Sequence, residues 1–202
     1  MDENSDRRAA FEAALGSEYF ALQGVRASSI SEAGTRASLF FTTLTGTLLA
    51  LGFLAGTTDA VAPVAYASVP IVIVLGTLSF LRLVDIAIED VVALQAMQRI
   101  RTYYAEISPE AAAYFPMPRT EGEVNTLLDT GASRARWKGT LTTAAAVGTV
   151  VSLTFGAATA FALADLGAPV TVAVVFGIVI AIVFGGLMFR YQDRRFVQSV
   201  PD

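Results

Sequence analysis

Cysteine and histidine are both absent from the 202 residues of this chain. Without them the protein can form no disulfide, no Cys nucleophile and no Ser-His triad, and it lacks the thiolate and imidazole ligands that most zinc sites use. It also lacks the side chain that most often serves as a pH switch near neutrality. We therefore expect no metal site, no cofactor and no enzymatic activity.

Charge is scarce as well, because only 16% of the residues are charged, against about 25% in a soluble domain. Four stretches contain no Asp, Glu, Lys or Arg: 37–56, 61–81, 140–164 and 170–189. Each has about the 20 residues needed to cross roughly 30 Å of hydrocarbon. They predict an all-α, polytopic membrane protein with four transmembrane helices in two hairpins, residues 37–81 and 140–189. The first 30 residues have no apolar signal region, so we expect no cleaved signal peptide.

Positive charge is missing from two of the predicted loops, around residues 57–60 and 165–169. The 14 Lys and Arg residues instead lie before the first span, between the second and third spans, and after the fourth. Positive residues mark the cytoplasmic side of a membrane protein. This distribution predicts that both termini are cytoplasmic, and that the helical cytoplasmic parts are residues 1–36 and 82–139, with a tail at 190–202.

The segment before the first span is expected to be helical, because residues 5–33 have apolar side chains at intervals near 3.6. Ser29 and Glu32 have the spacing of a capping box, which predicts that a new helix begins there and continues into the first span. The N-terminal helix either packs on the protein's own cytoplasmic part or lies on the membrane surface. Its polar face is acidic rather than rich in Lys and Arg, which favours the first alternative.

The second span is expected to continue into the cytoplasm as one long helix, because residues 82–105 keep apolar side chains at helical spacing and contain no Gly or Pro. Start signals for two shorter helices follow at 108–110 and 120–123. Cations and an indole beside the spans predict anchoring at the membrane interface. The expected anchors are Arg134, Arg136, Trp137, Lys138 and Arg190.

Small residues recur every four positions in the last two spans. They are Ala173, Gly177, Ala181 and Gly185 in the fourth span, with Gly148 and Gly156 in a similar row of the third. Small residues let two helix backbones approach closely, which drives helix association in lipid. The pattern predicts that the third and fourth spans form a tight hairpin through these faces. An interface between subunits is the alternative.

Charged residues appear directly after the second span, where Arg82, Asp85 and Glu89 lie within about 60° of one another on a helix. In one interpretation the helix leaves the membrane here, and the residues are solvated or paired within the chain, with Arg82 and Asp85 as partners. In the other, several subunits place this stripe around an axis as an acidic ring at a pore mouth. No charged residue lies deep in any span, which argues against an ion-coupled transporter.

Three segments carry a resemblance to known proteins: VRASSISEAGTRASLFFTTLTGTLLALGF (25–53), FLRLVDIAIED (80–90) and MQRIRTYYAEISPEAAAYF (97–115). Together they resemble a group of uncharacterised bacterial integral membrane proteins with four spans. The resemblance covers the first two spans and the helix after them. It implies a multi-pass protein of the bacterial inner (cell) membrane, and it implies no activity, cofactor or site residue.

The predicted function is that of a non-catalytic integral membrane protein, a scaffold or signalling partner that binds through its cytoplasmic helices. The alternative is an oligomeric pore or a small-solute or cation channel, which requires assembly because four apolar helices cannot enclose a water-filled path alone. Hydroxyl side chains of the first span either line such a path or bond to their own helix carbonyls. These are Thr42, Thr43, Thr45 and Thr47. The expected partners are the lipid bilayer, further copies of the chain in a homo-oligomer and a cytoplasmic protein, with no nucleic acid.

Overall fold

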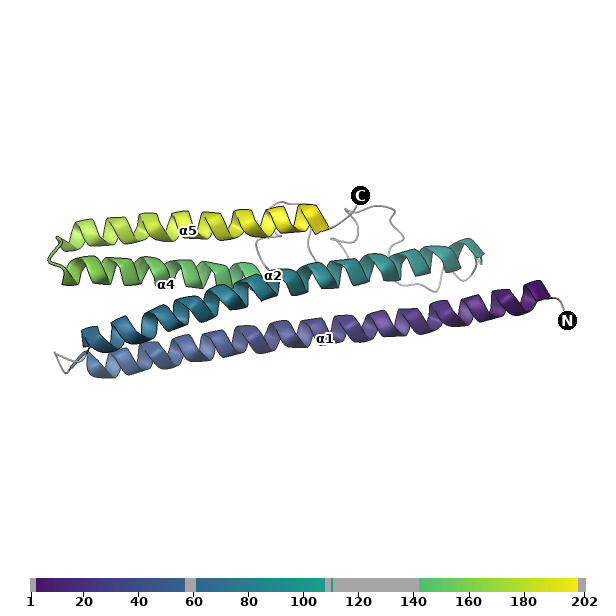
Figure 1. Cartoon of the computed structure of the whole chain (residues 1–202), viewed down its shortest axis with the longest axis horizontal. Coiled ribbons are helices and arrows are strands. Elements are labelled where there is room, and N and C mark those ends of the chain that lie inside the picture. Colours follow the sequence, from purple (N-terminus) through teal and green to yellow (C-terminus); the bar gives the residue numbers. More distant parts are fainter. Residues whose placement is uncertain (1–2, 57–60, 108–109, 111–141, 200–202) are drawn as a thin grey trace. The chain divides into compact units, whose positions relative to one another are not determined.

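The computed structural model describes residues 3–56, 61–107, 110 and 142–199. These residues form four helices and no strand (Figure 1). The helices are α1 (Glu3–Leu54), α2 (Val61–Ile107), α4 (Thr143–Asp165) and α5 (Val170–Ser199). Each contains a stretch that is long and apolar enough to cross a membrane. The prediction of an all-α protein with four such helices is therefore confirmed.

The first two helices are much longer than a bilayer requires. With 52 and 47 residues and a rise of 1.5 Å per residue, α1 and α2 are about 78 and 70 Å long. The hydrocarbon core is only about 30 Å thick. The uncharged stretches lie in the second half of α1 and the first half of α2. The remaining part of each helix, about 40–50 Å, carries the charged residues.

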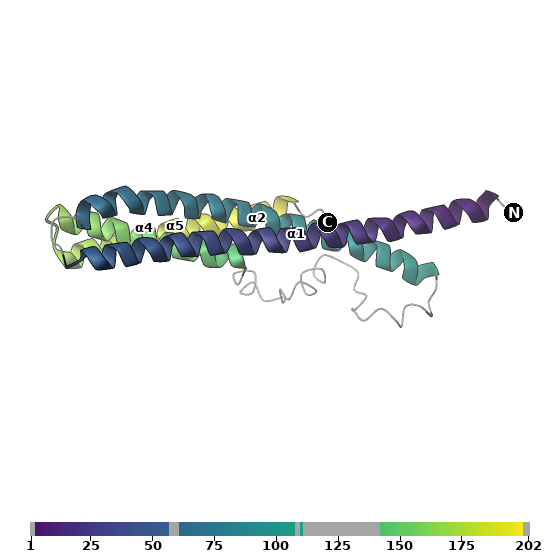
Figure 2. The same cartoon turned by 90° about the horizontal axis from the view of Figure 1, so that it is seen from below.

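The prediction that a new helix begins at Ser29 is wrong. Helix α1 runs from Glu3 to Leu54 without a break (Figure 2), and Ser29 lies in its middle with only 6% of its surface exposed. A capping box begins a helix only where the preceding backbone is not helical, and α1 contains no proline that would force it out of helical geometry. Helix α2 likewise continues through Pro70.

The chain divides into two compact units, and α1 and α2 contribute to both. The first unit contains residues 3–32 and 86–107 of the described chain, and the second contains residues 33–85 and 142–199. In the first unit, the two helical segments run antiparallel, because residues early in α1 contact residues late in α2: Glu12 meets Tyr104, and Arg26 meets Asp90.

The inner face of α1 in the first unit follows a seven-residue repeat. Most of its less exposed residues recur at intervals of three and four: Glu12, Leu15, Tyr19, Leu22, Arg26 and Ser29, with Gly16 and Glu32 beside this row. This spacing is typical of a helix that packs along one partner helix. The opposing segment of α2 supplies most of the apolar packing, with Val91, Leu94, Met97 and Ile100 buried.

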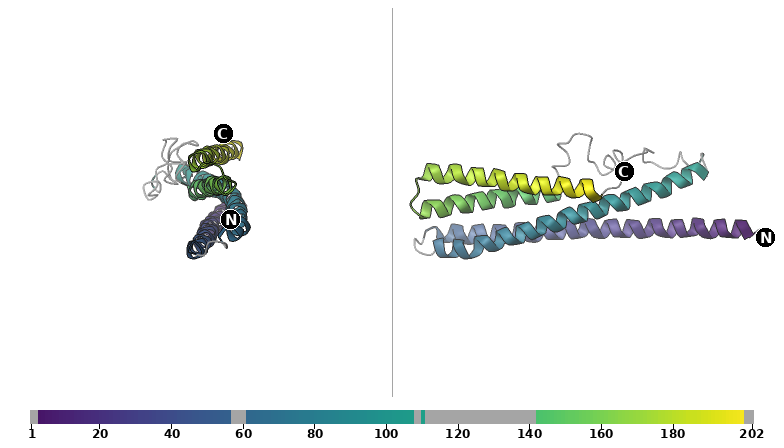
Figure 3. Two further views of the ribbon diagram at one scale, coloured as in Figure 1. Left: turned by 90° about the vertical axis from the view of Figure 1, so that its left-hand side faces the viewer. Right: turned by 45° about the horizontal axis from the view of Figure 1, so that its top comes forward.

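In the second unit, α4 and α5 run side by side and antiparallel (Figures 1 and 3). Gly167 allows the tight connection between them, because its φ of +89° lies in the left-handed region that favours glycine. The centre of this unit is filled by large buried side chains. They are Phe40 of α1, Val72 and Phe80 of α2, and Val147 and Val151 of α4.

Candidate functional site

A row of polar contacts joins α1 to α2 in the first unit, and we call it the polar ladder: Glu12, Tyr19, Arg26, Asp90, Arg101 and Tyr104. At one end, Nε of Arg26 donates a hydrogen bond of 2.8 Å to a carboxylate oxygen of Asp90. The two side chains are only 27% and 20% exposed. Partial burial strengthens this ion pair relative to one on the open surface, where solvent screens the charges.

The middle of the polar ladder is a contact between an arginine and a tyrosine. Nη2 and Nε of Arg101 donate to the hydroxyl oxygen of Tyr19 over 2.6 and 3.2 Å. The guanidinium carbon also lies 5.5 Å from the centroid of the Tyr19 ring, within the range of a cation–π interaction. A planar guanidinium suits this double contact better than an ammonium group would.

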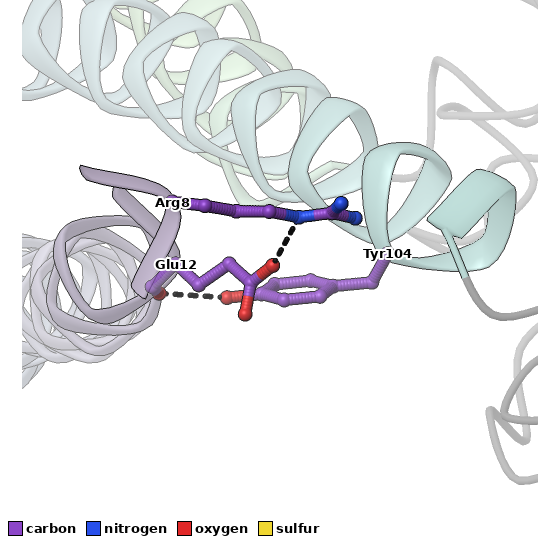
Figure 4. Close-up of polar contacts among 3 residues, drawn as sticks. All are labelled: Arg8, Glu12 and Tyr104. Carbon is purple, nitrogen blue, oxygen red and sulfur yellow. Dashed lines mark hydrogen bonds and ion pairs between the residues drawn. The ribbon is translucent and has the colours of Figure 1, made fainter. Parts of the chain in front are cut away.

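At the far end of the polar ladder, the hydroxyl of Tyr104 donates to the backbone carbonyl of Glu12 over 2.9 Å (Figure 4). The carboxylate of Glu12 accepts a hydrogen bond from Nε of Arg8, one turn earlier on α1. The rings of Phe11 and Tyr103 pack edge to face, with centroids 5.5 Å apart. The whole ladder fixes the register of α1 against α2 in this unit.

A second polar cluster lies in the second unit, after the uncharged stretches of α2 and α5. Nη2 of Arg195 donates to Asp85 over 2.7 Å. This hydrogen bond, then the charge interaction with Tyr191, raise the pKa of Arg195 above its already high value. Because the pKa is raised, the guanidinium stays charged at any pH at which the protein is stable, and only alkali beyond the ordinary arginine value would discharge it.

Gln192 belongs to the same cluster and is almost fully buried, with 6% of its surface exposed. Its Nε2 donates to Oγ1 of Thr142 over 3.4 Å. Thr142 is the N-cap of α4, and its Oγ1 also accepts a hydrogen bond from the backbone N–H of Ala145. This contact joins the beginning of α4 to the last turns of α5.

Of the predicted charged stripe, the structure places Asp85 against Arg195, which lies 110 residues further along the chain. Arg82 is half-buried and Glu89 is exposed, and both interact with other residues. The ion pair compensates the charge of Asp85 within the chain. The expected anchor Arg190 is exposed on α5, whereas 134–138, which hold the other anchors, and the start signals at 108–109 and 120–123 lie outside the described residues.

The structure brings several of the predicted small residues together between α4 and α5. A Cβ atom added to Gly156 would overlap the carbonyl oxygen of Gly177 and lie 2.7 Å from Cβ of Ala181. Ala173 is buried, and a Cβ on Gly185 would lie 3.4 Å from Oγ of Ser152. The two backbones therefore approach so closely that only a hydrogen fits at Gly156 and Gly177.

Gly148 has a different neighbour from the one its spacing suggested. A Cβ added there would lie 2.9 Å from the ring of Phe80 on α2, and 3.5 Å from the sulfur of Met188. Sequence reasoning also missed Gly76 of α2, where an added Cβ would overlap Val151 of α4 and lie against Phe40 of α1. A lone glycine among β-branched and leucine side chains was the available signal.

Two of the four threonines in the first span bond to their own helix. The hydroxyl of Thr43 donates to the carbonyl of Leu39 over 2.8 Å, and that of Thr47 donates to the carbonyl of Thr43 over 2.9 Å. Such internal bonds satisfy a hydroxyl without water or a ligand. Within the part of the chain that the structure describes, no group of three or more acidic side chains could hold a metal ion.

The geometry defines a class of protein: a helical protein with four helices that can cross a membrane, two of which continue well beyond the thickness of a bilayer. Comparisons with protein-family models, with curated proteins and with solved structures found no match. The function is therefore argued from the residues and contacts above.

Proposed function

We propose that this is a non-catalytic, multi-pass protein of the bacterial cell membrane that acts as a scaffold or signalling partner. Its spans form two hairpins, α1 with α2 and α4 with α5, and both termini lie in the cytoplasm. The first unit is then a cytoplasmic module of two helices that binds another protein or a second copy of the chain.

The distribution of positive charge supports this orientation. None of the 14 Lys and Arg residues lies in the loops after α1 and after α4, where the nearby charged residues are Asp59 and, at the end of α4, Asp165. Lys and Arg are retained on the cytoplasmic side during insertion. The ends of the helices that carry the first unit and the C-terminal tail therefore share that side.

The observation that carries the proposal is the length of α1 and α2 together with the polar ladder. An anchor needs about 20 residues per helix, yet these helices contain 52 and 47. Outside the uncharged stretches they are joined by hydrogen bonds from Arg26, Arg101 and Tyr104. Two helices that are fixed against each other present a defined surface to a partner, whereas two helices that did not contact each other would not.

The surface of the first unit also supports a binding role. Large apolar side chains are exposed on its part of α1, where the proposed surroundings are water rather than lipid. They are Phe11, Phe20, Val25 and Ile30. They point in different directions around the helix, and Phe11 packs on Tyr103, so the apolar surface offered to a partner is centred on Phe20, which is 72% exposed. The channel alternative draws less support, because Asp85 is already paired with Arg195.

Photo-crosslinking in intact cells tests the binding role. Phe20 is replaced by the photoreactive analogue p-benzoylphenylalanine, and the control carries it at Phe53, which is 83% exposed within the uncharged stretch of α1. We expect protein adducts from the Phe20 variant and only lipid adducts from the control. Equal protein adducts from both positions, or none from Phe20, would contradict a binding module in the first unit.

A further inference from the structure

In the first unit, α1 has an exposed face on the side away from α2. Counting every third and fourth residue from Ala13 gives a second stripe, which we call the outer seam. In the first unit the outer seam consists of Ala13, Ser17, Phe20, Gly24, Ala27 and Ser31. All six are exposed, none is charged, and a Cβ added to Gly24 would meet nothing within 4 Å. Phe20 is 72% exposed.

Charge on α1 is kept away from this face. From residue 9 onward, the charged side chains of the helix lie within an arc of about 160° when 100° is counted per residue. They are Glu12, Glu18, Arg26, Glu32 and Arg36. A helix face that stays in water is normally charged or polar. An uncharged face that includes an exposed phenylalanine indicates a surface that is covered in the assembled protein.

We propose that a second copy of the chain covers the outer seam, and that two α1 helices pack in parallel about a twofold axis along the membrane normal. This rests on the proposed function, which places the first unit in water. Two copies inserted in one membrane have the same orientation, so their α1 helices run parallel and identical residues meet at the axis. The seam repeats every seven residues, as such pairing requires.

The composition of the outer seam suits contact with the same seam of a second copy. It carries no charge, so no like charges meet at the axis. Its Ala, Ser and Gly residues allow the backbones to approach closely, and Phe20 supplies apolar area. Because α1 is one helix, the spacing continues through exposed, uncharged residues as far as Gly52, including Gly34, Phe41 and Leu48.

The area that the seam offers is sufficient for a dimer. From Ala13 to Gly52 the helix rises about 60 Å, and a contact strip about 10 Å wide covers about 600 Å² on each partner. The total of about 1,200 Å² reaches the range of specific protein interfaces. The inner stripe that contacts α2 lies on the opposite side of α1, so the dimer leaves the polar ladder in place.

Single cysteines test the proposal directly, because the chain contains none. Ala27→Cys lies in the outer seam, and the control Val25→Cys lies two residues away on another face of the helix, where Val25 is 49% exposed. Two copies of residue 27 at the axis would bring the Cα atoms into the range of about 4.4–6.8 Å that a disulfide requires. With an oxidant, membranes carrying Ala27→Cys should yield at least tenfold more covalent dimer than membranes carrying Val25→Cys. Equal yields, or no dimer from Ala27→Cys, would overturn the inference.

A second measurement separates this inference from the proposed function. Phe20→Glu should convert a dimer into a monomer in native mass spectra of lipid nanodiscs, with the helical circular dichroism unchanged, whereas Val25→Glu should leave the dimer intact. A monomeric wild-type protein whose Phe20 photoadduct contains a different protein would refute the second copy and retain the binding module. If neither a dimer nor a photoadduct were found, both the second copy and the binding module would be refuted.

Discussion

At the scale of single residues, arginines determine which helical segments lie side by side. Arg26, Arg101 and Arg195 bond to Asp90, Tyr19 and Asp85, at separations of 64, 82 and 110 residues. Each pairing joins two different helices, and it forms only when the donor and the acceptor lie at the same level along them. If one helix were shifted by one turn along the other, the donor and the acceptor would be too far apart to bond. These contacts therefore specify the register of the helices more than they add to stability.

Removing one carboxylate tests this role. Asp90→Asn should lower the free energy of unfolding by about 1 kcal/mol, because a partly buried guanidinium keeps its charge and loses its partner. Glu106→Gln removes the same charge from an exposed position of the same helix and should change it by less than about 0.5 kcal/mol. The measurement is thermal unfolding of the purified protein in detergent. Equal shifts for the two variants would show that Arg26 gains nothing from Asp90.

Local sequence spacing was a poor guide to these contacts. Asp85 accepts a hydrogen bond from Arg195 on another helix, which no spacing within α2 could indicate. Ser29 and Glu32 matched a capping box, yet Ser29 faces inward in the middle of α1. A side chain that can cap a helix does so only where the chain already turns, and tertiary packing decides where that happens.

At the scale of helices, α4 and α5 depend on contact between backbones. The close approach at Gly156 and Gly177 brings many atoms within van der Waals range, which is the main attraction between helices in lipid. Gly186 lies about two and a half turns beyond Gly177 on α5, and a Cβ added there would meet nothing within 4 Å. Helix α5 thus contains one glycine that its packing requires, Gly177, and one that it does not require, Gly186.

That difference provides a matched pair of variants. Gly177→Ala should destabilise the protein by about 1–3 kcal/mol, because the added methyl group would press on Ala160 and the backbone of Gly156. Gly186→Ala should be neutral or slightly stabilising, since alanine favours a helix over glycine. Thermal unfolding in the same detergent compares the two. A Gly177→Ala variant as stable as Gly186→Ala would contradict the close packing of α4 against α5.

The helices themselves could be predicted from the sequence, and the reason is physical. In hydrocarbon every backbone N–H and C=O group must bond within the segment, so a long uncharged stretch such as 170–189 is expected to form an α-helix. The importance of Gly76 could not be predicted in the same way. Its neighbours Phe40 and Val151 come from α1 and α4, and their approach depends on how three helices pack.

At the scale of the whole molecule, the distribution of charge gives a prediction about orientation. Glu18→Cys should be protected in intact cells from a membrane-impermeant maleimide and become labelled after permeabilisation, because Glu18 lies in the proposed cytoplasmic unit. Leu166→Cys, at an 83% exposed position between α4 and α5, should be labelled in intact cells. Reaction yields are compared by mass spectrometry. Labelling of both positions in intact cells, or the reverse pattern, would contradict the proposed orientation.

The antiparallel pairing in the first unit has a consequence for the time course of synthesis. Glu12 leaves the ribosome 92 residues before Tyr104, and Arg26 leaves 64 residues before Asp90. At 5–20 residues per second, the inner face of α1 waits about 3–18 s for its partner. Only 21 residues separate Gly156 from Gly177, so α4 and α5 meet within a few seconds of emerging. The inner face of α1 is therefore exposed for several seconds before its neighbour is made, and neighbouring ribosomes on one message expose several such helices at once.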